Sequence, residues 1–574
     1  MKKLLSLIKG KYLAMTILTP LLVMGEVVME TTIPRIMAEL VDEGISKGDF
    51  DYVIKSGVLM IVMSLISLCF GAGAGRTVSI AGMGFAAEVR KKLFSKIQDF
   101  SFSNIDKFST SSLVTRMTTD TSNLQNAFMM AIRSMFRAPI MLVSASIMAF
   151  SINARLASIF LFAVPILAAF LFFIMTNAHP RFQKMLKKYD KLNSKIQENL
   201  IAVRVVKAFV RGEFEKEGFN KTAQEARNAQ IRAEKLVILN MPIMQMVVYT
   251  CTILVLWFGG RLIINGSMLS GGLISFITYI NQILMSLMMI SMSLMMIVIS
   301  KASITRIVEV LNETPEIPDG GDPQKKVKDG SVVFENVSFS YSGDASACTL
   351  SCINLEIMPG ETVGIIGGTG SAKSTLVNLI PRFYEVTSGS LKIGGVDIKE
   401  YTQEELRSAI GMVLQKNVLF SGSIKENLRW GNHDATDEEI KEACKAAQAD
   451  EFISNFPDGY DTDLSQGGVN VSGGQKQRLC IARALLKRPK ILILDDSTSA
   501  VDTDTDRKIR EAFKESLVDT TTIIIAQRIS SVCDADKIVV LDNGQINAVG
   551  THEELLKTCD IYKEVYESQQ KGVA

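Results

Sequence analysis

Six long runs of apolar residues occupy the first half of the chain, and no run of comparable length follows residue 310. Each run reaches about 20 residues, the length that a helix needs to cross about 30 Å of hydrocarbon. The runs lie at residues 13–33, 56–78, 127–150, 155–176, 238–260 and 272–298. Beyond residue 310 the apolar stretches have the length of ordinary core strands and helices. The pattern predicts an all-α transmembrane domain of six helices, followed by a second domain.

A polar segment rich in proline and glycine, residues 313–323, separates the two halves. This composition is typical of a linker. We therefore expect a transmembrane domain at 13–310, a linker at 311–330 and a second domain at 331–574. Residues 1–12 contain four lysines and lack a cleavage site of the signal-peptide type, and they predict an interfacial amphipathic helix that leads into the first span.

Lysine and arginine are concentrated in two long connections between the spans, residues 78–126 and 177–237, whereas the opposite connections are short or acidic. By the positive-inside rule both chain termini and both long connections are cytoplasmic, which predicts a multi-pass protein of the cytoplasmic membrane. Apolar residues at helical spacing in 88–94 and 191–200 indicate that the spans continue as helices. Over about 25 residues such helices would project about 40 Å. The alternative is two solvated hairpins without a partner.

Composition narrows the class of protein further. The 574 residues are 47% hydrophobic and 21% charged, with a net charge of +2. The apolar content excludes a disordered chain, and the small net charge argues against nucleic acid as a partner, which leaves the lipid bilayer. The eight cysteines include no CxxC pair, so we expect neither a disulfide framework nor a zinc site. We interpret the cysteines as small buried hydrophobes in a reducing compartment.

A glycine-rich turn follows an apolar strand at residues 361–366 and leads into a helix. This order is that of a phosphate-binding loop, in which backbone N–H groups and a helix N-terminus surround phosphates. A lysine adds positive charge and a serine hydroxyl binds Mg²⁺. Alanine stands at position 372, where the motif requires glycine. The predicted ATP-binding residues of this turn are Gly367, Gly368, Thr369, Gly370, Ser371, Ala372, Lys373, Ser374 and Thr375.

A second apolar strand, residues 490–494, ends in two carboxylates, and the first of them, Asp495, is the expected partner of Mg²⁺. Upstream lies the block Asn470–Arg478. With these motifs the chain resembles the ATP-binding cassette (ABC) exporters, in the half-transporter form with the membrane domain first. The resemblance covers essentially the whole length and includes residues 102–108 and 198–209, which are similar to the two coupling regions of that family. It implies an α/β P-loop ABC ATPase fold for the nucleotide-binding domain at 331–574, with ATP and Mg²⁺ as cofactors.

Further site residues are implied by the resemblance at the positions that match. Tyr341 matches the aromatic residue that stacks on adenine. Gln415 matches the glutamine that senses the γ-phosphate, and with Ser374 and Asp495 it would bind Mg²⁺. The signature segment, which in this family closes over ATP held by the other subunit, matches Val471, Ser472, Gly473, Gly474 and Gln475. The segment that crosses the dimer interface matches Ser499, Ala500, Val501 and Asp502.

Two positions depart from the family pattern, and both belong to the catalytic machinery. Asp496 stands where the family has a glutamate general base, and Gln527 stands where it has a switch histidine. Aspartate is one methylene shorter, and glutamine carries no charge and cannot shuttle a proton. A misplaced base typically costs about 10²–10⁴ in rate. The chain thus resembles the degenerate-site subunit of heterodimeric bacterial multidrug exporters, which implies a partner half-transporter with a competent glutamate and histidine.

The spans contain candidate substrate contacts. The sixth span is rich in methionine, a flexible side chain that suits a promiscuous surface, although helical spacing of this kind is also typical of packing. Glu26 is a candidate cation-selecting group. We expect Arg133 and Arg137 at the cytoplasmic boundary, and Glu30 toward the outer boundary. The candidate substrate surface comprises Glu26, Asn281, Met285, Met288, Met289 and Met292.

The predicted function is ATP-driven export of hydrophobic or amphiphilic compounds across the cytoplasmic membrane. In this hypothesis the chain is a translocase subunit whose own ATP site is slow or non-hydrolytic and whose signature segment completes the partner's site. Lipid or peptide export is an alternative, and so is a membrane subunit in which ATP binding regulates or gates a partner. A soluble ATPase that acts on DNA or ribosomes is excluded by the six spans.

Overall fold

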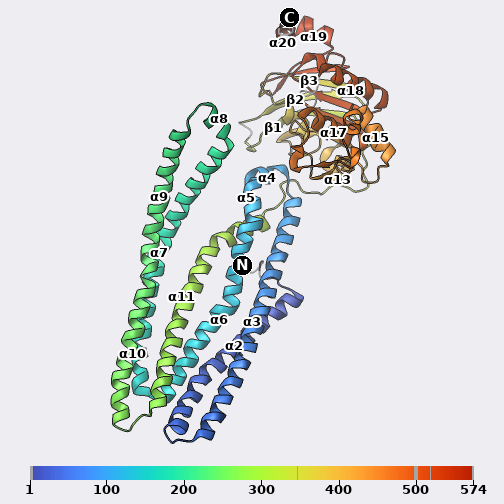
Figure 1. Cartoon of the computed structure of the whole chain (residues 1–574). Coiled ribbons are helices and arrows are strands. Elements are labelled where there is room, and N and C mark those ends of the chain that lie inside the picture. Colours follow the sequence, from blue (N-terminus) through green and yellow to red (C-terminus); the bar gives the residue numbers. More distant parts are fainter. Residues whose placement is uncertain (1–3, 5, 345–346, 497–501, 518, 572–574) are drawn as a thin grey trace. The chain divides into compact units, whose positions relative to one another are not determined.

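The computed structural model describes residues 4, 6–344, 347–496, 502–517 and 519–571. The chain divides into two compact units (Figure 1). The first comprises residues 1–99 and 109–313, and the second comprises residues 100–108 and 314–574. The segment 100–108 comes from the first half of the sequence but groups with the second unit.

The first unit consists of helices. Six stretches of the described residues are long and apolar enough to cross a membrane, which confirms the prediction of six spans. The helices are α2 (Gly10–Glu39), α3 (Phe50–Gln98), α5 (Thr110–Thr115), α6 (Thr121–Ile152), α7 (Ala154–Ile201), α8 (Val203–Ala208), α9 (Gly212–Ile238), α10 (Asn240–Ile264) and α11 (Ser270–Asn312), with π-helical turns at Leu40–Ile45 and Arg116–Asp120.

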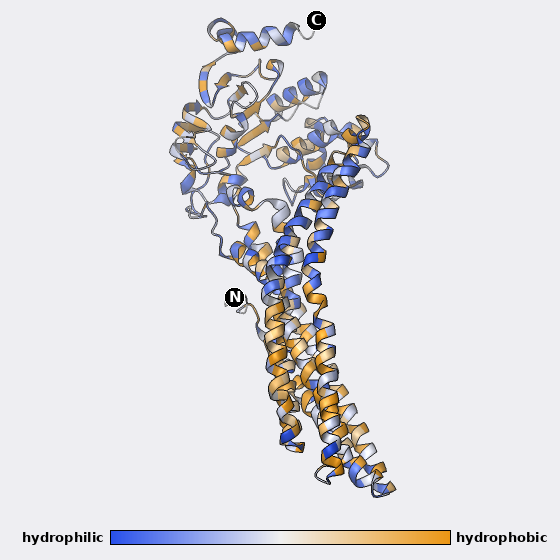
Figure 2. Cartoon of the chain, turned by 90° about the vertical axis from the view of Figure 1, so that its left-hand side faces the viewer, coloured by the Kyte–Doolittle hydropathy of each residue, from blue (hydrophilic) through white to orange (hydrophobic). Residues whose placement is uncertain are grey.

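Several of these helices continue far beyond the apolar runs. Helix α3 has 49 residues and α7 has 48, so each is about 70 Å long at 1.5 Å per residue. Asp49 caps α3 and Asn153 caps α7 by accepting hydrogen bonds from backbone N–H groups of the first turn. Figure 2 shows that α7 is hydrophilic toward α8 and hydrophobic at its other end, and that the polar helix α9 leads from α8 into the hydrophobic helix α10. The long connections are therefore helical extensions of the spans, as the spacing of apolar residues predicts.

Small and polar residues bring the spans together. The hydroxyl of Thr19 in α2 hydrogen-bonds to that of Thr77 in α3 at 2.9 Å, and the hydroxyl of Tyr279 in α11 donates to the carbonyl oxygen of Thr31 at 2.8 Å. Ser293 and Ser300 of α11 are fully buried. Small residues allow helices to approach closely where lipid supplies no hydrophobic driving force between them.

The second unit is an α/β domain, as expected. Its strands are β1 (Val332–Phe339), β2 (Leu350–Ile357), β3 (Thr362–Ile366), β4 (Ser388–Ile393), β5 (Val396–Asp397), β6 (Ile410–Val413), β7 (Gly422–Ser423), β8 (Asp463–Leu464), β9 (Ile491–Asp495), β10 (Thr521–Ile525), β11 (Lys537–Asp542) and β12 (Gln545–Gly550). Its helices are α4 (Phe102–Phe108), α12 (Lys373–Leu379), α13 (Gln403–Ser408), α14 (Ile424–Leu428), α15 (Asp437–Ala446), α16 (Asp450–Ser454), α17 (Gly473–Leu486), α18 (Thr503–Ser516), α19 (His552–Thr558) and α20 (Asp560–Lys571).

The main sheet has six strands in the order β12-β11-β3-β10-β9-β6. All neighbouring pairs except β11–β12 are parallel. A second sheet, β2-β1-β4-β5, is antiparallel. Because parallel strands end at the same edge of a sheet, the residues that follow β3, β6, β9 and β10 lie close together, and ligands of open α/β sheets bind at this edge.

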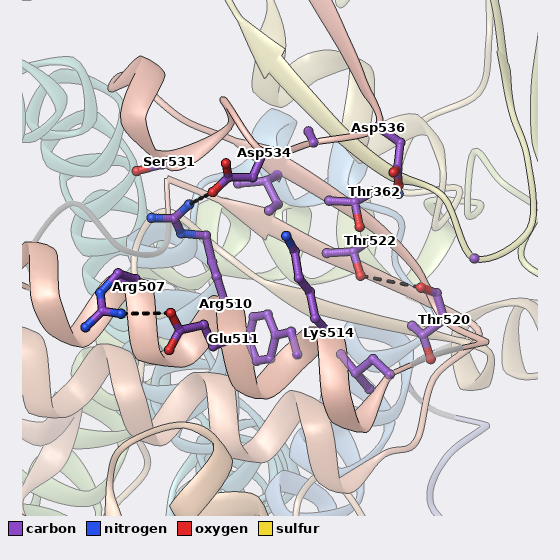
Figure 3. Close-up of a pocket in the computed structure, with 15 residues that line it drawn as sticks. Thr362, Arg507, Arg510, Glu511, Lys514, Thr520, Thr522, Ser531, Asp534 and Asp536 are labelled. Carbon is purple, nitrogen blue, oxygen red and sulfur yellow. Dashed lines mark hydrogen bonds and ion pairs between the residues drawn. The ribbon is translucent and has the colours of Figure 1, made fainter. Parts of the chain in front are cut away.

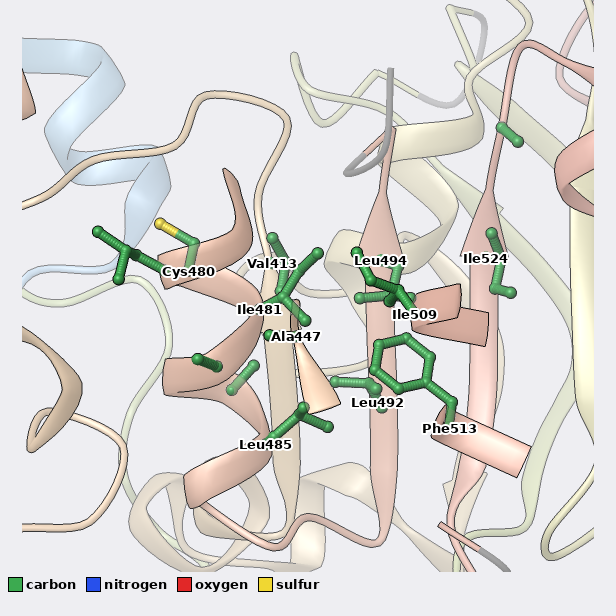
Figure 4. Packing of buried hydrophobic residues seen from close by; sticks show 14 of the residues in the cluster. Val413, Ala447, Cys480, Ile481, Leu485, Leu492, Leu494, Ile509, Phe513 and Ile524 are labelled. Atoms are coloured by element: carbon green, nitrogen blue, oxygen red, sulfur yellow. The ribbon is translucent and has the colours of Figure 1, made fainter. Parts of the chain in front are cut away.

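The domain core explains the continuous apolar strands. Every residue of β9 is buried, since helices cover both faces of a parallel sheet. Figure 4 shows Cys480 and Ile481 of α17 and Phe513 of α18 in the buried cluster that contains Leu492 and Leu494 of β9. This packing fixes the strand ends that bear the candidate site.

The cysteines follow the expectation only in part. Cys251, Cys444, Cys480 and Cys559 are buried, and the described residues contain no disulfide. The prediction of burial is wrong for Cys69 and Cys352, which are exposed. Cys69 lies in an apolar span, so a side chain exposed there faces lipid rather than water.

Candidate functional site

The predicted phosphate-binding loop connects β3 to α12 at the carboxyl edge of the main sheet. A Cβ atom on Gly367 would lie 2.2 Å from the carbonyl oxygen of Leu541, so this position requires glycine. The ammonium group of Lys373 donates to the carbonyl oxygens of Gly367 (2.9 Å) and Gly368 (2.7 Å). Burial lowers the pKa of Lys373. The structure thus forms a compact loop at the start of α12 with the lysine folded against it.

Ala372 is strained. It precedes α12 in the left-handed conformation, with φ 71° and ψ 23°, which costs a residue with a Cβ about 1–2 kcal/mol. Glycine adopts this conformation freely but also loses more entropy on folding. We expect Ala372→Gly to stabilise the ATPase domain by about 0.5–1 kcal/mol, seen as a rise of about 1–4 °C in its thermal midpoint.

The matched control for Ala372→Gly is Ala443→Gly in α15, where the alanine is helical. Glycine there should destabilise the domain by about 1 kcal/mol. A fall in the midpoint for both variants would show that the left-handed conformation at position 372 is not a source of strain.

The three candidate Mg²⁺ ligands lie at the same edge of the sheet. The hydroxyl of Ser374 donates to Asp495 Oδ1 at 3.0 Å. Asp495 is buried, which raises its pKa. Gln415 follows β6, and its side chain is close enough to Asp496 to influence the pKa of that carboxyl group. Hydroxyl, carboxylate and amide oxygens are ligands that Mg²⁺ prefers, so this donor set fits the ion.

The two departures from the family pattern contact each other. The side-chain amide of Gln527 donates to Asp496 Oδ2 at 2.9 Å. Burial raises the pKa of the Asp496 carboxyl group, and the nearby Gln415 and Gln527 side chains oppose this rise. Gln477, in α17, donates to the main-chain oxygen of Asp496 at 3.2 Å. The carboxylate at the base position therefore accepts a hydrogen bond from a neutral amide, and a second amide holds its main chain.

The segment around Gln527 is itself held by the last helix. Gln569 of α20 donates to the main-chain oxygen of Gln527 at 2.7 Å and accepts from the N–H of Ile529 at 2.9 Å. The sequence analysis missed Gln569 and Gln477. Gln477 lies inside the block 470–478 that carries the family resemblance and could have been selected there, whereas no motif points to Gln569.

The predicted signature segment forms the start of α17. Ser472 caps the helix by accepting from the N–H of Gln475 at 3.2 Å, and the Gln475 side chain accepts in return from the N–H of Ser472 at 2.9 Å. Ser472 and Gly473 are exposed, Gly474 lies in the first turn, and Val471 packs partly against the core. An exposed helix N-terminus is suited to binding an anion.

The predicted interface segment is described only at its end. Asp502 caps α18 by accepting from the N–H of Thr505 at 3.0 Å. Ser499, Ala500 and Val501 lie outside the described residues.

Tyr341 lies beside the phosphate-binding loop. Its hydroxyl is 3.1 Å from the hydroxyl of Thr375, and its ring packs edge-on against Phe339 and Tyr384. The side chain is 54% exposed. An exposed aromatic ring next to this loop is placed to stack on a nucleotide base.

A chain of aromatic contacts leads from Tyr341 to helix α4. Tyr384 touches Tyr341, and its hydroxyl donates to the Asp106 carboxylate at 2.9 Å. Phe102 packs on Phe383 with ring centroids 4.4 Å apart. Burial and the Asp106 carboxylate both raise the pKa of Tyr384, so this hydroxyl keeps its proton in alkaline solution. Helix α4 is thus tied to the segment that contacts the candidate base-stacking residue.

We expect Tyr384→Phe to loosen α4, because a hydrogen bond to a charged group contributes about 1.5–3 kcal/mol. Amide hydrogen exchange in residues 102–108 should accelerate by about 10-fold or more. Tyr460→Phe is the matched control, since Tyr460 donates to Asp450 at 2.7 Å elsewhere in the same unit. Equal exchange in the two variants would contradict this role for Tyr384.

In the helical unit, Glu26 lies with two other charged residues. Arg137 of α6 forms ion pairs with Glu26 (2.5 Å) and Glu30 (2.7 Å) of α2. The expectation that Arg137 lies at the membrane boundary and Glu30 toward the opposite one is therefore wrong. Two carboxylates compensate the guanidinium, which allows it to lie among the spans. We call Arg137, Glu26 and Glu30 the Arg137 cluster.

The predicted methionine surface is divided by the fold. Asn281, Met285 and Met289 line a cavity of about 260 Å³ beside the Arg137 cluster. Met288 instead packs against a buried apolar cluster of the spans, and Met292 is exposed. Only part of the methionine stripe shares one site.

A cavity of about 540 Å³ in the second unit lies beside α18 and does not include the phosphate-binding loop. Figure 3 shows Arg507 paired with Glu511 and Arg510 with Asp534 on its wall, at 2.9 Å and 3.4 Å. The arginines of this cavity are therefore already paired with carboxylates.

Comparison with known proteins covers both units. Residues 16–287 match the family model described as the ABC transporter transmembrane region, and residues 350–499 match the ABC transporter model. The uncharacterised ABC transporter ATP-binding protein YfiB of Bacillus subtilis is 38% identical over 569 residues, which is 99% of this chain and 98% of that protein. The uncharacterised ABC transporter ATP-binding protein Rv1273c of Mycobacterium tuberculosis is 38% identical over 543 residues, 94% of this chain and 93% of that protein.

The solved structure of a bacterial Atm1-family ABC exporter with ATP bound superposes with a TM-score of 0.83 at 25% identity. The match covers 97% of this chain and 98% of that one. The likeness therefore extends over both units.

Proposed function

The chain belongs to the ABC transporter family, and from that premise we propose that it takes part in ATP-driven export of hydrophobic or amphiphilic compounds across the cytoplasmic membrane. It acts as one subunit of a heterodimer, and its own ATP site is the slow or non-hydrolytic one. A second half-transporter supplies the competent glutamate and histidine. Both chain termini and both long helical connections lie in the cytoplasm, in line with the distribution of lysine and arginine.

The contact between Gln527 and Asp496 carries this proposal. A general base must hold the attacking water at hydrogen-bond distance in the transition state. The Asp496 carboxylate is one methylene short of a glutamate and accepts a hydrogen bond from the amide of Gln527. Gln527 cannot carry a proton, since its amide does not titrate. Both catalytic groups are therefore weakened in the same site.

The residues that bind nucleotide are retained. The loop from Gly367 to Thr375 surrounds phosphates, Lys373 pairs with them, and Tyr341 stacks on the base. Ser374, Gln415 and Asp495 hold Mg²⁺, which when bound neutralises charge on the phosphates. ATP is thus bound tightly and cleaved slowly at this site.

The signature segment and α8 support a partner subunit. Ser472 begins a well-capped helix with an exposed N-terminus, which serves an ATP bound by another chain. Helix α8 and the residues that flank it expose large apolar side chains. Exposed apolar patches mark protein contacts. These side chains are Leu200, Ile201, Val205, Phe209 and Val210.

The purified chain alone is expected to bind ATP but to hydrolyse it at least about 10²-fold more slowly than its complex with a competent half-transporter. Photolabelling with azido-ATP should mark the chain equally with and without vanadate, because vanadate traps only a site that turns over. Lys373→Ala should remove the label. Brisk hydrolysis by the chain alone, abolished in Lys373→Ala, would overturn the proposal.

Transport is tested on vesicles that contain the chain and the half-transporter that co-purifies with it. Uptake of an amphiphilic dye should stop when hydrolysis at the partner is blocked. Dye movement that needs ATP binding but not hydrolysis would instead indicate a gating subunit.

A further inference from the structure

The Arg137 cluster carries a net negative charge inside the helical unit. Its two carboxylates face one guanidinium, and both Arg137 Nη atoms are bonded to them. The side chain of Glu26 is only 9% exposed and that of Glu30 is 30% exposed. Charged groups among spans are costly and mark functional sites when they are present. One negative charge in the cluster has no compensating positive charge within it.

The cavity of about 260 Å³ adjoins this cluster and has two kinds of wall. Glu30, Arg137, Gln282 and Ser286 form a polar wall, and Met141, Met285 and Met289 form an apolar one. Pockets that enclose a drug-sized ligand measure about 300–1,000 Å³. The cavity therefore accommodates the polar head and adjoining carbons of an amphiphile, whose remainder lies outside.

The donor groups of the polar wall make hydrogen bonds within the protein, whereas one of its buried acceptors makes none. The Ser286 hydroxyl donates to the main-chain oxygen of Gln282 (2.7 Å). The side-chain amide of Asn281 donates to the main-chain oxygen of Ile277 (3.1 Å). The amide of Gln282 donates to the main-chain oxygen of Glu30 at 3.2 Å. One buried acceptor of a wall residue, Gln282 Oε1, and one of the adjoining cluster, Glu26 Oε2, receive no hydrogen bond from any described residue. A buried acceptor without a donor is unfavourable by about 1–3 kcal/mol.

We propose that this cavity binds the protonated amine head of an amphiphilic substrate, with the adjoining carbons on Met285 and Met289. The inference rests on the proposed export function and names its substrate class. The positive charge of the ligand offsets the negative charge of the cluster, and one of its N–H groups supplies the donor that Gln282 Oε1 lacks. A quaternary ammonium offers charge without N–H groups, and a neutral alcohol offers a donor without charge. Both bind more weakly.

The test measures binding to the full chain in nanodiscs without ATP, by equilibrium dialysis. The probes are 2-(1-naphthyl)ethylamine, its N,N,N-trimethyl derivative, 2-(1-naphthyl)ethanol and 1-naphthylacetate. The amine should bind at least about 10-fold more tightly than each of the others, which corresponds to about 1.4 kcal/mol. Equal binding of the amine and the trimethyl derivative, or tighter binding of the alcohol or the anion, would overturn the proposal.

Two variants and one control locate the site. Glu30→Gln should weaken amine binding about 10-fold or more, and Met285→Trp should abolish it by filling the cavity without a change of charge. Glu39→Gln makes the same chemical change on the same helix at an exposed pair with Arg35 and should leave binding unchanged. Loss of binding in Glu39→Gln, or retention in both other variants, would exclude this cavity.

These measurements are independent of ATP hydrolysis. Absence of amine preference in a chain that binds ATP and is slow to cleave it would overturn the substrate class and leave the proposed function intact. Brisk hydrolysis by the chain alone would overturn the heterodimer role without altering the binding result.

Discussion

Replacing Asp496 by glutamate together with Gln527 by histidine is expected to raise the ATP turnover of the purified chain by about 10²-fold. The longer side chain restores the reach of a general base, and the imidazole replaces an amide that now occupies the carboxylate at 2.9 Å. The loop, Lys373 and the Mg²⁺ ligands are unchanged in this variant. Phosphate release in nanodiscs measures the rate.

The single variants separate the two contributions. Asp496 has a left-handed backbone (φ 50°), which aspartate tolerates better than glutamate, so Asp496→Glu alone should gain less than the pair. Asp496→Asn in the Gln527→His background retains the size of aspartate without its charge and should show no gain. If the double variant is as slow as the natural chain, the missing base and histidine do not limit this site.

Arg137→Met is expected to destabilise the helical unit by about 3–5 kcal/mol, because it leaves two carboxylates without their cation. Glu26 is affected most, since its side chain is nine-tenths buried. The loss should appear as a lower thermal midpoint and a lower yield of folded chain. Adding Glu26→Gln and Glu30→Gln to Arg137→Met should recover most of the stability, since no uncompensated charge then remains.

Arg261→Met is the matched control for Arg137→Met. Arg261 lies at the end of α10 against the ring of Trp257, at 5.4 Å from its centroid, a contact that contributes about 0.5–1 kcal/mol at an exposed site. A similar loss of stability in the two variants would show that the ion pairs of the Arg137 cluster contribute no more to stability than the exposed contact of Arg261. Failure of the triple variant to recover would show that the guanidinium is needed for packing rather than for charge.

Features with a local cause could be predicted from the sequence. The six spans follow from the length of the apolar runs, and the phosphate-binding loop follows from glycine, lysine and serine within nine residues. The rigid continuation of α3 and α7 follows from apolar residues at helical spacing. In each case the physical constraint acts over a few helical turns, so neighbouring residues contain the information.

Contacts between distant segments could not be predicted in this way. The substitutions at positions 496 and 527 were evident, but their hydrogen bond depends on β9 and β10 lying side by side. Gln569 reaches Gln527 from the last helix, with no periodic or compositional signal. Arg137 was predicted at the membrane boundary. Its carboxylate partners lie more than 100 residues away in α2, so its neighbours in the sequence do not reveal them.

Helix α11 joins the two ends of the helical unit in one uninterrupted rod of 43 residues. Gln282 lies on the cavity, and 24 positions later, about 36 Å along the axis, Arg306 donates to Asp120 at 2.7 Å. An unbroken helix resists torsion, so a ligand that turns α11 at the cavity must also turn Arg306 away from Asp120. If the proposed ligand turns α11, the unbroken helix would transmit that rotation as torque to its far end.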